Sequence, residues 1–153
     1  MTSTSPQLQM DLRIPTRRPL LPMKAAMVFL DRNEDDVLAL VGDRKLVAFN
    51  VAQQGASRMY PLIWRGSVEA YQAGESVRPD DAAVVDDILP QRQSLRAVEV
   101  KNIFSCGQWL FQTLIDQGCI ARDLRRPVHA GRAQSPWVTR ASVAEFLKQR
   151  RVS

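Results

Sequence analysis

The sequence has little of what metal centres and common catalytic motifs require. It contains one histidine, His129, and two cysteines, Cys106 and Cys119, which form no CxxC pair. A zinc site built from several Cys and His ligands is therefore excluded. Walker A, GxGxxG and GxSxG motifs are also absent, so the enzyme classes that depend on them are not indicated. We expect no enzymatic activity, no cofactor and no bound metal.

Long apolar segments are lacking too. No run of about 18 uncharged apolar residues occurs, so no membrane span is expected. Residues 1–9 are polar, which is not the pattern of a secretory signal. With only two cysteines and no signal, we expect a cytoplasmic, nucleoid-associated protein with reduced thiols. A disulfide between Cys106 and Cys119 would be incompatible with an intact helix between them.

Positive charge is concentrated toward the C-terminal end of the chain. The net charge is +5, and residues 93–153 hold ten basic and four acidic residues, whereas residues 76–92 hold two basic and four acidic ones. This asymmetry favours a polyanionic partner for the C-terminal part. A solvated basic surface that keeps the protein soluble is the alternative.

Residues 1–22 are rich in Ser, Thr, Pro and Arg, and prolines at four positions disfavour helix. We predict an extended or disordered basic arm. Its arginines, Arg13, Arg17 and Arg18, are candidates for contacts along a DNA backbone or in a minor groove. The alternation of Leu8, Met10, Leu12 and Ile14 is also compatible with a short strand laid on another surface.

The stretch from Ile103 to Ala121 has the pattern of a short amphipathic helix, which we predict over residues 106–117. Ser105 with Gln108 three residues later forms a capping-box pattern, and Gly118 is placed to end the helix. The apolar face consists of Leu110, Phe111, Leu114 and Ile115. The other face and its flanks carry Ser105, Gln108, Trp109, Gln112, Thr113 and Asp116. Glutamine can pair bidentately with an adenine edge, so this helix suits DNA reading. An ordinary surface helix is the alternative.

The chain contains an internal repeat. A shift of 73 places Val37-Leu38 on Leu110-Phe111, and a shift of 75 places Ser67-Val68 on Ser142-Val143. We predict one plan twice, over residues 23–75 and 94–153: helix, turn, helix, two-stranded wing, closing helix. Trp64 and Trp137, which precede the closing helices, are expected in the core. Residues 76–93 are predicted as an acidic linker or as a short helix over 80–89, with solvated aspartates at 80, 81, 86 and 87.

Both copies resemble the winged helix-turn-helix of excisionases and MerR-like regulators. In the first copy the resemblance lies in Lys24-Ala25-Ala26, Val37 to Val41, Leu46 to Phe49, Ile63-Trp64-Arg65 and Ser67 to Tyr71. In the second copy it lies in Ser105 to Ala121 and Trp137 to Leu147. The resemblance implies a mainly α fold with small β-wings, arranged as two tandem winged helix-turn-helix domains. It also implies DNA binding, with the second helix in the major groove and the wing on the backbone or in the minor groove.

The two copies differ in the charge of the second helix. Where the second copy has Gln108, Trp109 and Gln112, the first has Asp35, Asp36 and Ala39. Glu34, Asp35 and Asp36 together would repel a polyanion at close range. We therefore expect the first copy to stay off DNA and to support self-association or contact with another protein. The alternative is that these acids only favour the start of a helix.

The predicted wing of the second copy, residues 122–132, is rich in arginine, whose planar fork of donors suits phosphate. The candidate DNA contacts outside the helix are Arg122, Arg125, Arg126, Arg132 and Arg140. Lys148, Arg150 and Arg151 either add phosphate contacts or complement a helix C-terminus. If about five of these residues meet phosphates, log affinity should fall with log salt with a slope of roughly −4 to −5.

The predicted function is binding of double-stranded DNA by helix 106–117 and wing 122–132. The protein would act as a transcription regulator, or as an excisionase-like architectural factor that bends DNA for recombination in a mobile element. The alternative is a protein-interaction adaptor, such as an antirepressor or a polymerase contact factor. The target site, the oligomeric state and the choice between regulator and excisionase do not follow from the residues.

Overall fold

The computed structural model describes residues 18–75, 80–126 and 136–152, and these ranges form seven helices and six short strands. The first half, residues 18–75, contains β1 (Leu20–Pro22), α2 (Met23–Leu30), α3 (Glu34–Gly42), β2 (Ala48–Asn50), β3 (Pro61–Trp64) and α4 (Arg65–Gln72). The second half, residues 80–152, contains α5 (Asp81–Ile88), β4 (Ser94–Leu95), α6 (Ala97–Ile103), α7 (Gln108–Asp116), β5 (Val138–Thr139), α8 (Arg140–Gln149) and β6 (Arg151–Val152).

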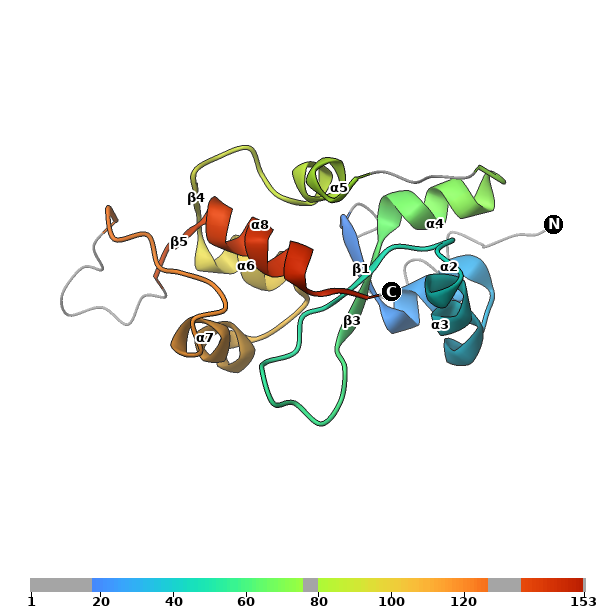
Figure 1. Cartoon of the computed structure of the whole chain (residues 1–153), viewed down its shortest axis with the longest axis horizontal. Coiled ribbons are helices and arrows are strands. Elements are labelled where there is room, and N and C mark those ends of the chain that lie inside the picture. Colours follow the sequence, from blue (N-terminus) through green and yellow to red (C-terminus); the bar gives the residue numbers. More distant parts are fainter. Residues whose placement is uncertain (1–17, 76–79, 127–135, 153) are drawn as a thin grey trace.

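The strands form two small antiparallel sheets, so the fold is mixed α/β. The larger sheet has the order β1-β3-β2-β6 and the smaller one pairs β4 with β5. The larger sheet lies at the centre of the molecule, with α2, α3 and α4 on one side and α6, α7 and α8 on the other (Figure 1). The end of the chain returns to this centre, because β6 pairs with β2 through Ala48–Val152 and Phe49–Arg151.

The order of elements is similar in the two halves. Apart from α5 at its start and β6 at its end, the second half follows the first: a strand, two helices, one or two strands and a closing helix, as β1-α2-α3-β2-β3-α4 and β4-α6-α7-β5-α8. The first strand pairs with the last in both halves, with Leu20 opposite Trp64 and Ser94 opposite Thr139. The hairpin differs. In the described part of the second half, only a single bridge from Arg122 to Val138 stands where the first half has β2.

Helices α3 and α5 begin at side-chain caps. The Asn33 Oδ1 accepts a hydrogen bond from the Asp36 amide at 2.8 Å and so caps α3. Asp80 caps α5 in the same way through the Ala83 amide at 2.7 Å, so residues 81–88 are helical. The buried face of α3 is narrow. Leu40 is buried beside Val37 and Val41, whereas Leu38 is exposed.

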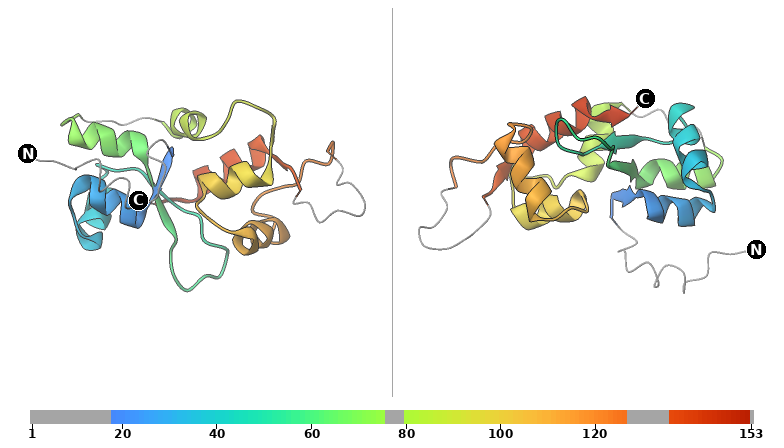
Figure 2. Two further views of the ribbon diagram at one scale, coloured as in Figure 1. Left: turned by 180° about the vertical axis from the view of Figure 1, so that it is seen from behind. Right: turned by 90° about the horizontal axis from the view of Figure 1, so that it is seen from below.

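The core joins the two halves. One hydrophobic cluster contains Leu20, Phe49 and Leu62 from the first half together with Phe111 and Leu147 from the second. A second cluster lies between α2, α3, α4 and one face of the sheet and includes Ala26, Val37 and Ile63. Figure 2 shows the sheet between the two groups of helices from two further directions. The two halves therefore pack together through a shared interior, which gives each small unit a larger core than it would have alone.

Two segments that were predicted to lie outside the repeats contribute to this core. Leu20 and Leu21, at the end of the predicted arm, form β1 and are almost fully buried. In the predicted linker, Val84, Val85 and Ile88 of α5 are buried as well. The four aspartates of this segment lie at the surface as expected, since Asp80, Asp86 and Asp87 are exposed and Asp81 is half-buried, and each also has a partner in the structure. Asp80 caps α5, Asp81 and Asp86 pair with Arg151 and Arg140, and Asp87 accepts from Trp64.

Candidate nucleic-acid interface

Helix α7 is amphipathic as predicted, with its apolar face in the core. Phe111 and Leu114 are fully buried, and Leu110 and Ile115 pack against the same cluster. Gly118 ends the helix at a positive φ of 75°, where the amides of Gly118 and Cys119 bond to the carbonyls of Ile115 and Leu114. Ile120 then re-enters the core. These contacts hold the opposite face of α7 toward solvent.

The start of α7 differs from the prediction. The helix begins at Gln108 after Gly107, which offers no side-chain cap, rather than at Ser105. Ser105 has a positive φ of 50° and lies in the turn between α6 and α7. Its Oγ accepts a hydrogen bond from Arg18 Nη1 at 2.8 Å, and its carbonyl accepts one from the Tyr60 hydroxyl. Tertiary contacts from the first half therefore hold a residue that the sequence pattern assigned to a local cap.

The outer face of α7 presents the predicted polar set. Trp109 is 68% exposed. Gln108 is exposed and accepts a hydrogen bond from Lys101 Nζ at 2.9 Å. Gln112 Nε2 donates to Asp116 Oδ1 at 3.0 Å, and Thr113 Oγ1 donates to the Trp109 carbonyl at 2.7 Å. The Gln112 bond is exposed to water, so a base edge could replace it at a cost of about 1 kcal/mol.

The segment that follows α7 positions basic side chains around one buried carboxylate. Asp123 is only 3% exposed and accepts two hydrogen bonds from the Arg125 guanidinium, at 3.1 Å each, and one from the Ser94 hydroxyl. These donors, Arg125 before Ser94, hold the pKa of Asp123 well below its ordinary value of 3.8. Arg125 also donates to Gln93, and its side chain remains 66% exposed.

Two neighbouring arginines lie at the surface of the same segment. Arg126 stacks on the half-buried Trp137, with its Cζ 4.1 Å from the ring centroid. Trp137 is therefore not a core residue as expected, whereas Trp64 is. Arg122 is exposed. The rest of the predicted wing, residues 127–132 with His129 and Arg132, lies outside the described residues, as do Arg13 and Arg17 of the arm.

Other arginines that were predicted to contact phosphates are instead bonded to groups of the protein itself. Arg140 donates to the Pro90 carbonyl at 2.8 Å and to Asp86 at 2.9 Å, which fastens α8 to α5. Arg150 donates to the Ala52 carbonyl at 2.8 Å and lies over the Phe146 ring. Arg151 pairs with Asp81. Lys148 alone of the C-terminal set is fully exposed. The available positive charge is thus smaller than the composition indicates.

Residues that sequence reasoning missed lie on the β2–β3 hairpin, residues 50–61. The hairpin reaches α7 from the first half, and its tip exchanges two hydrogen bonds with Gln117. A groove of about 500 Å³ separates the two and is lined by Arg58, Tyr60, Cys106 and Trp109, among others. Burial raises the pKa of the Cys106 thiol to about 11, and both cysteines are free. No local signal in the sequence points to a contact across more than 40 residues.

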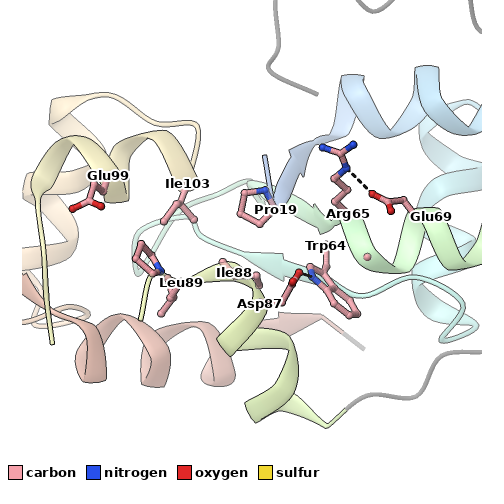
Figure 3. Close-up of a pocket in the computed structure, with 11 residues that line it drawn as sticks. Pro19, Trp64, Arg65, Glu69, Asp87, Ile88, Leu89, Glu99 and Ile103 are labelled. Carbon is pink, nitrogen blue, oxygen red and sulfur yellow. Dashed lines mark hydrogen bonds and ion pairs between the residues drawn. The ribbon is translucent and has the colours of Figure 1, made fainter. Parts of the chain in front are cut away.

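A second, larger groove of about 750 Å³ lies between α4, α5 and α6 (Figure 3). Its side chains form internal contacts. Trp64 Nε1 donates to Asp87 at 2.7 Å and Arg65 pairs with Glu69 at 2.7 Å. Glu99, at the other end, pairs with Arg92. Three carboxylates make this groove a poor surface for a polyanion, and within the described residues no cluster of His, Cys, Asp and Glu suits a metal ion.

Two further observations bear on the class of protein. None of the helices in the described residues is long and apolar enough to cross a membrane. Comparison with known families, characterised proteins and solved structures finds no significant match to this chain. The function is therefore argued from the residues and their geometry alone.

Proposed function

We propose that the protein binds double-stranded DNA through the outer face of α7 and acts as a transcription regulator or an excisionase-like architectural factor. The observation that carries the proposal is the orientation of α7. Its apolar face is buried, while Gln108 and Trp109 are exposed and Gln112 is half-buried on the opposite face, and a segment with three arginines follows the helix. A helix of this kind fits the major groove, where amide side chains read base edges and arginines hold the backbone.

The proposal includes the architecture predicted from the sequence, two tandem winged helix-turn-helix units. The similar order of elements in the two halves supports it. In the first half the equivalent helix α3 begins with exposed Glu34, Asp35 and Asp36. If this helix entered the groove, its three carboxylates would lie close to phosphates and would be repelled by them, which disfavours binding. We therefore assign DNA reading to α7 alone.

The test uses duplex binding by the full chain. Gln112→Ala should relax preference at one base position, worth about 1–3 kcal/mol of discrimination, with little change in affinity for random duplex. Arg122→Ala with Arg126→Ala should weaken binding to every sequence and reduce the salt slope by about two. Arg125 is unsuitable for this purpose, because its loss would leave Asp123 buried without its partner.

Arg32→Ala is the matched control, since Arg32 is exposed in the turn between α2 and α3. It should leave binding unchanged. If the wild-type chain shows no affinity for random duplex at about 50 mM salt, the proposal is wrong. If the chain does bind, its preferred site can be selected from random duplex. Measurement of DNA bending on that site then distinguishes an architectural factor from a simple regulator.

A protein-interaction adaptor is the second candidate, and exposed apolar side chains favour it. Trp109 on α7 is 68% exposed, Met59 on the hairpin is 51% exposed, and Leu124 in the segment after α7 is 88% exposed. Aromatic and methionine side chains are enriched at protein interfaces. Absence of DNA binding together with loss of a partner complex on Trp109→Ala would favour this candidate.

A further inference from the structure

The β2–β3 hairpin of the first half is fastened to the far end of α7. The Gln54 amide donates to Gln117 Oε1 at 2.9 Å, and Gln117 Nε2 donates back to the Gln54 carbonyl at 3.1 Å. Gln117 is the residue that caps the C-terminus of α7. The hairpin tip therefore has a defined position relative to the helix, although 63 residues separate the two in sequence.

The neck of the hairpin is fixed as well. Asn50 Oδ1 accepts from the amides of Ala52 and Tyr60, at 3.1 and 2.9 Å, which holds the two sides of the hairpin together. The Tyr60 hydroxyl donates to the Ser105 carbonyl in the turn before α7. Burial is the main cause that raises the pKa of Tyr60, so the phenol keeps its proton and remains a donor at neutral pH. The hairpin thus contacts both ends of α7.

The groove between hairpin and helix is lined by one arginine and by no acidic residue, so its charge favours a polyanion. The groove is lined by Arg58 and Ser57 from the hairpin and by Gly107, Trp109 and Leu110 from the α7 side, and its lining contains no acidic residue. Arg18 lies at its border, through its bond to Ser105, which lines the groove. Arg58 is exposed, on the same groove as the outward-facing Trp109.

A helix in the major groove has a phosphate backbone on each side, because the groove is bounded by both strands and is only about 12 Å wide. Contacts to both backbones fix the helix in register. In this protein the segment 120–126 follows α7 and runs toward β5, and the hairpin lies near α7 on another side (Figures 1 and 2). The segment carries Arg122 and Arg126, and the hairpin carries Arg58.

We propose that the hairpin of the first half serves as a second wing for α7 of the second half, with Arg58 contacting a DNA phosphate. This inference rests on the proposed DNA binding and gives the first half a role in that binding. The acidic α3 makes no contact with the duplex, whereas the hairpin of the same half contacts it. Gln117 acts as a positioning residue that sets where Arg58 lies.

The experiment measures affinity of the full chain for a fluorescent duplex pool of random sequence, as a function of salt. Arg58→Ala should lower affinity about five- to tenfold near 100 mM salt and reduce the salt slope by about one. The control Arg32→Ala should do neither. If Arg58→Ala binds as well as the wild type while Arg122→Ala with Arg126→Ala weakens binding, the role of the hairpin is overturned and the proposed function remains intact. A wild-type chain that does not bind overturns both.

A double-mutant cycle tests the positioning role of Gln117. In a Gln117→Ala background the hairpin tip is released, so Arg58→Ala should cost less affinity than it does in the wild type. Far-UV circular dichroism and the unfolding midpoint should be nearly unchanged in all four proteins, because both side chains are at the surface. Strictly multiplicative losses would show that Arg58 acts independently of the Gln54–Gln117 contact and would overturn this part of the proposal.

Discussion

Asp123 shows at the scale of one residue how a charge supports the candidate interface. It is buried, yet it is ionised, because the Arg125 guanidinium and the Ser94 hydroxyl stabilise the carboxylate. The same contacts orient Arg125 at the surface. The segment after α7 is thereby ordered by an internal ion pair, and a hydrogen bond from the Ser94 hydroxyl to Asp123 joins it to β4.

This ion pair predicts a specific pH dependence of stability. Since the pKa of Asp123 is lower in the folded than in the unfolded protein, its stabilising contribution is complete above the ordinary value of 3.8 and is lost as the pH falls through the folded value. Asp123→Asn should therefore destabilise the protein at neutral pH, and the difference from the wild type should shrink below about pH 4. Urea unfolding across this range measures it.

Asp35→Asn provides the control for this measurement, because Asp35 is exposed at the start of α3. Its effect should be a few tenths of a kcal/mol, as expected for a surface charge near a helix N-terminus. A difference between Asp123→Asn and the wild type that stays constant from neutral pH to pH 3 would contradict the assignment.

At the scale of elements, the contact between Gly66 and Trp64 decides how α4 meets α5. Gly66 lies in the first turn of α4, and a Cβ placed there would come within 2.5 Å of the Trp64 ring. That ring is held by its hydrogen bond to Asp87 of α5. Gly66→Ala therefore forces the indole to move and should cost about 1–3 kcal/mol of unfolding free energy, despite the better helix propensity of alanine.

Gly42→Ala is the matched comparison in another helix, since a Cβ at Gly42 meets nothing within 4 Å. It should be neutral or stabilising by up to about 1 kcal/mol. Denaturant unfolding followed by far-UV circular dichroism compares the two variants. Equal stability of Gly66→Ala and the wild type would show that the indole relaxes freely, and that Asp87 does not hold it.

At the scale of the whole molecule, the shared core predicts that the two halves unfold together. Leu62 of the first half and Leu147 of the second are both fully buried in the same cluster. Leu62→Ala and Leu147→Ala should each lower the free energy of one common transition by about 2–5 kcal/mol. Two separate transitions, with each variant shifting only one, would contradict this prediction.

That experiment needs one local probe and one probe of the whole molecule. Trp64 fluorescence in a Trp109→Phe, Trp137→Phe background reports mainly on the first half, and far-UV circular dichroism reports on all helices. Coincident midpoints from the two signals are expected for a single cooperative unit. The pairing of β6 with β2 adds to the coupling, because the end of the chain completes the sheet of the first half.

The sequence by itself determined the elements whose signals are local. Asn33 caps α3, Gly118 ends α7, and the apolar spacing of α7 identifies its buried face. Caps and helical periodicity act within about four residues, so they can be read without knowledge of the fold. The exposed amide face of α7, on which the proposed function depends, belongs to this category.

Only the tertiary structure decided which charged and polar groups are free to act. Arg140, Arg150 and Arg151 resemble phosphate contacts in sequence, but they are bound to carbonyls and carboxylates from distant segments. Ser105 follows a capping pattern but is held by Arg18 and Tyr60 instead. The approach of the hairpin to α7 also depends on pairing across the chain. Such contacts form because burial of a shared core brings remote residues together, and no local pattern encodes their partners.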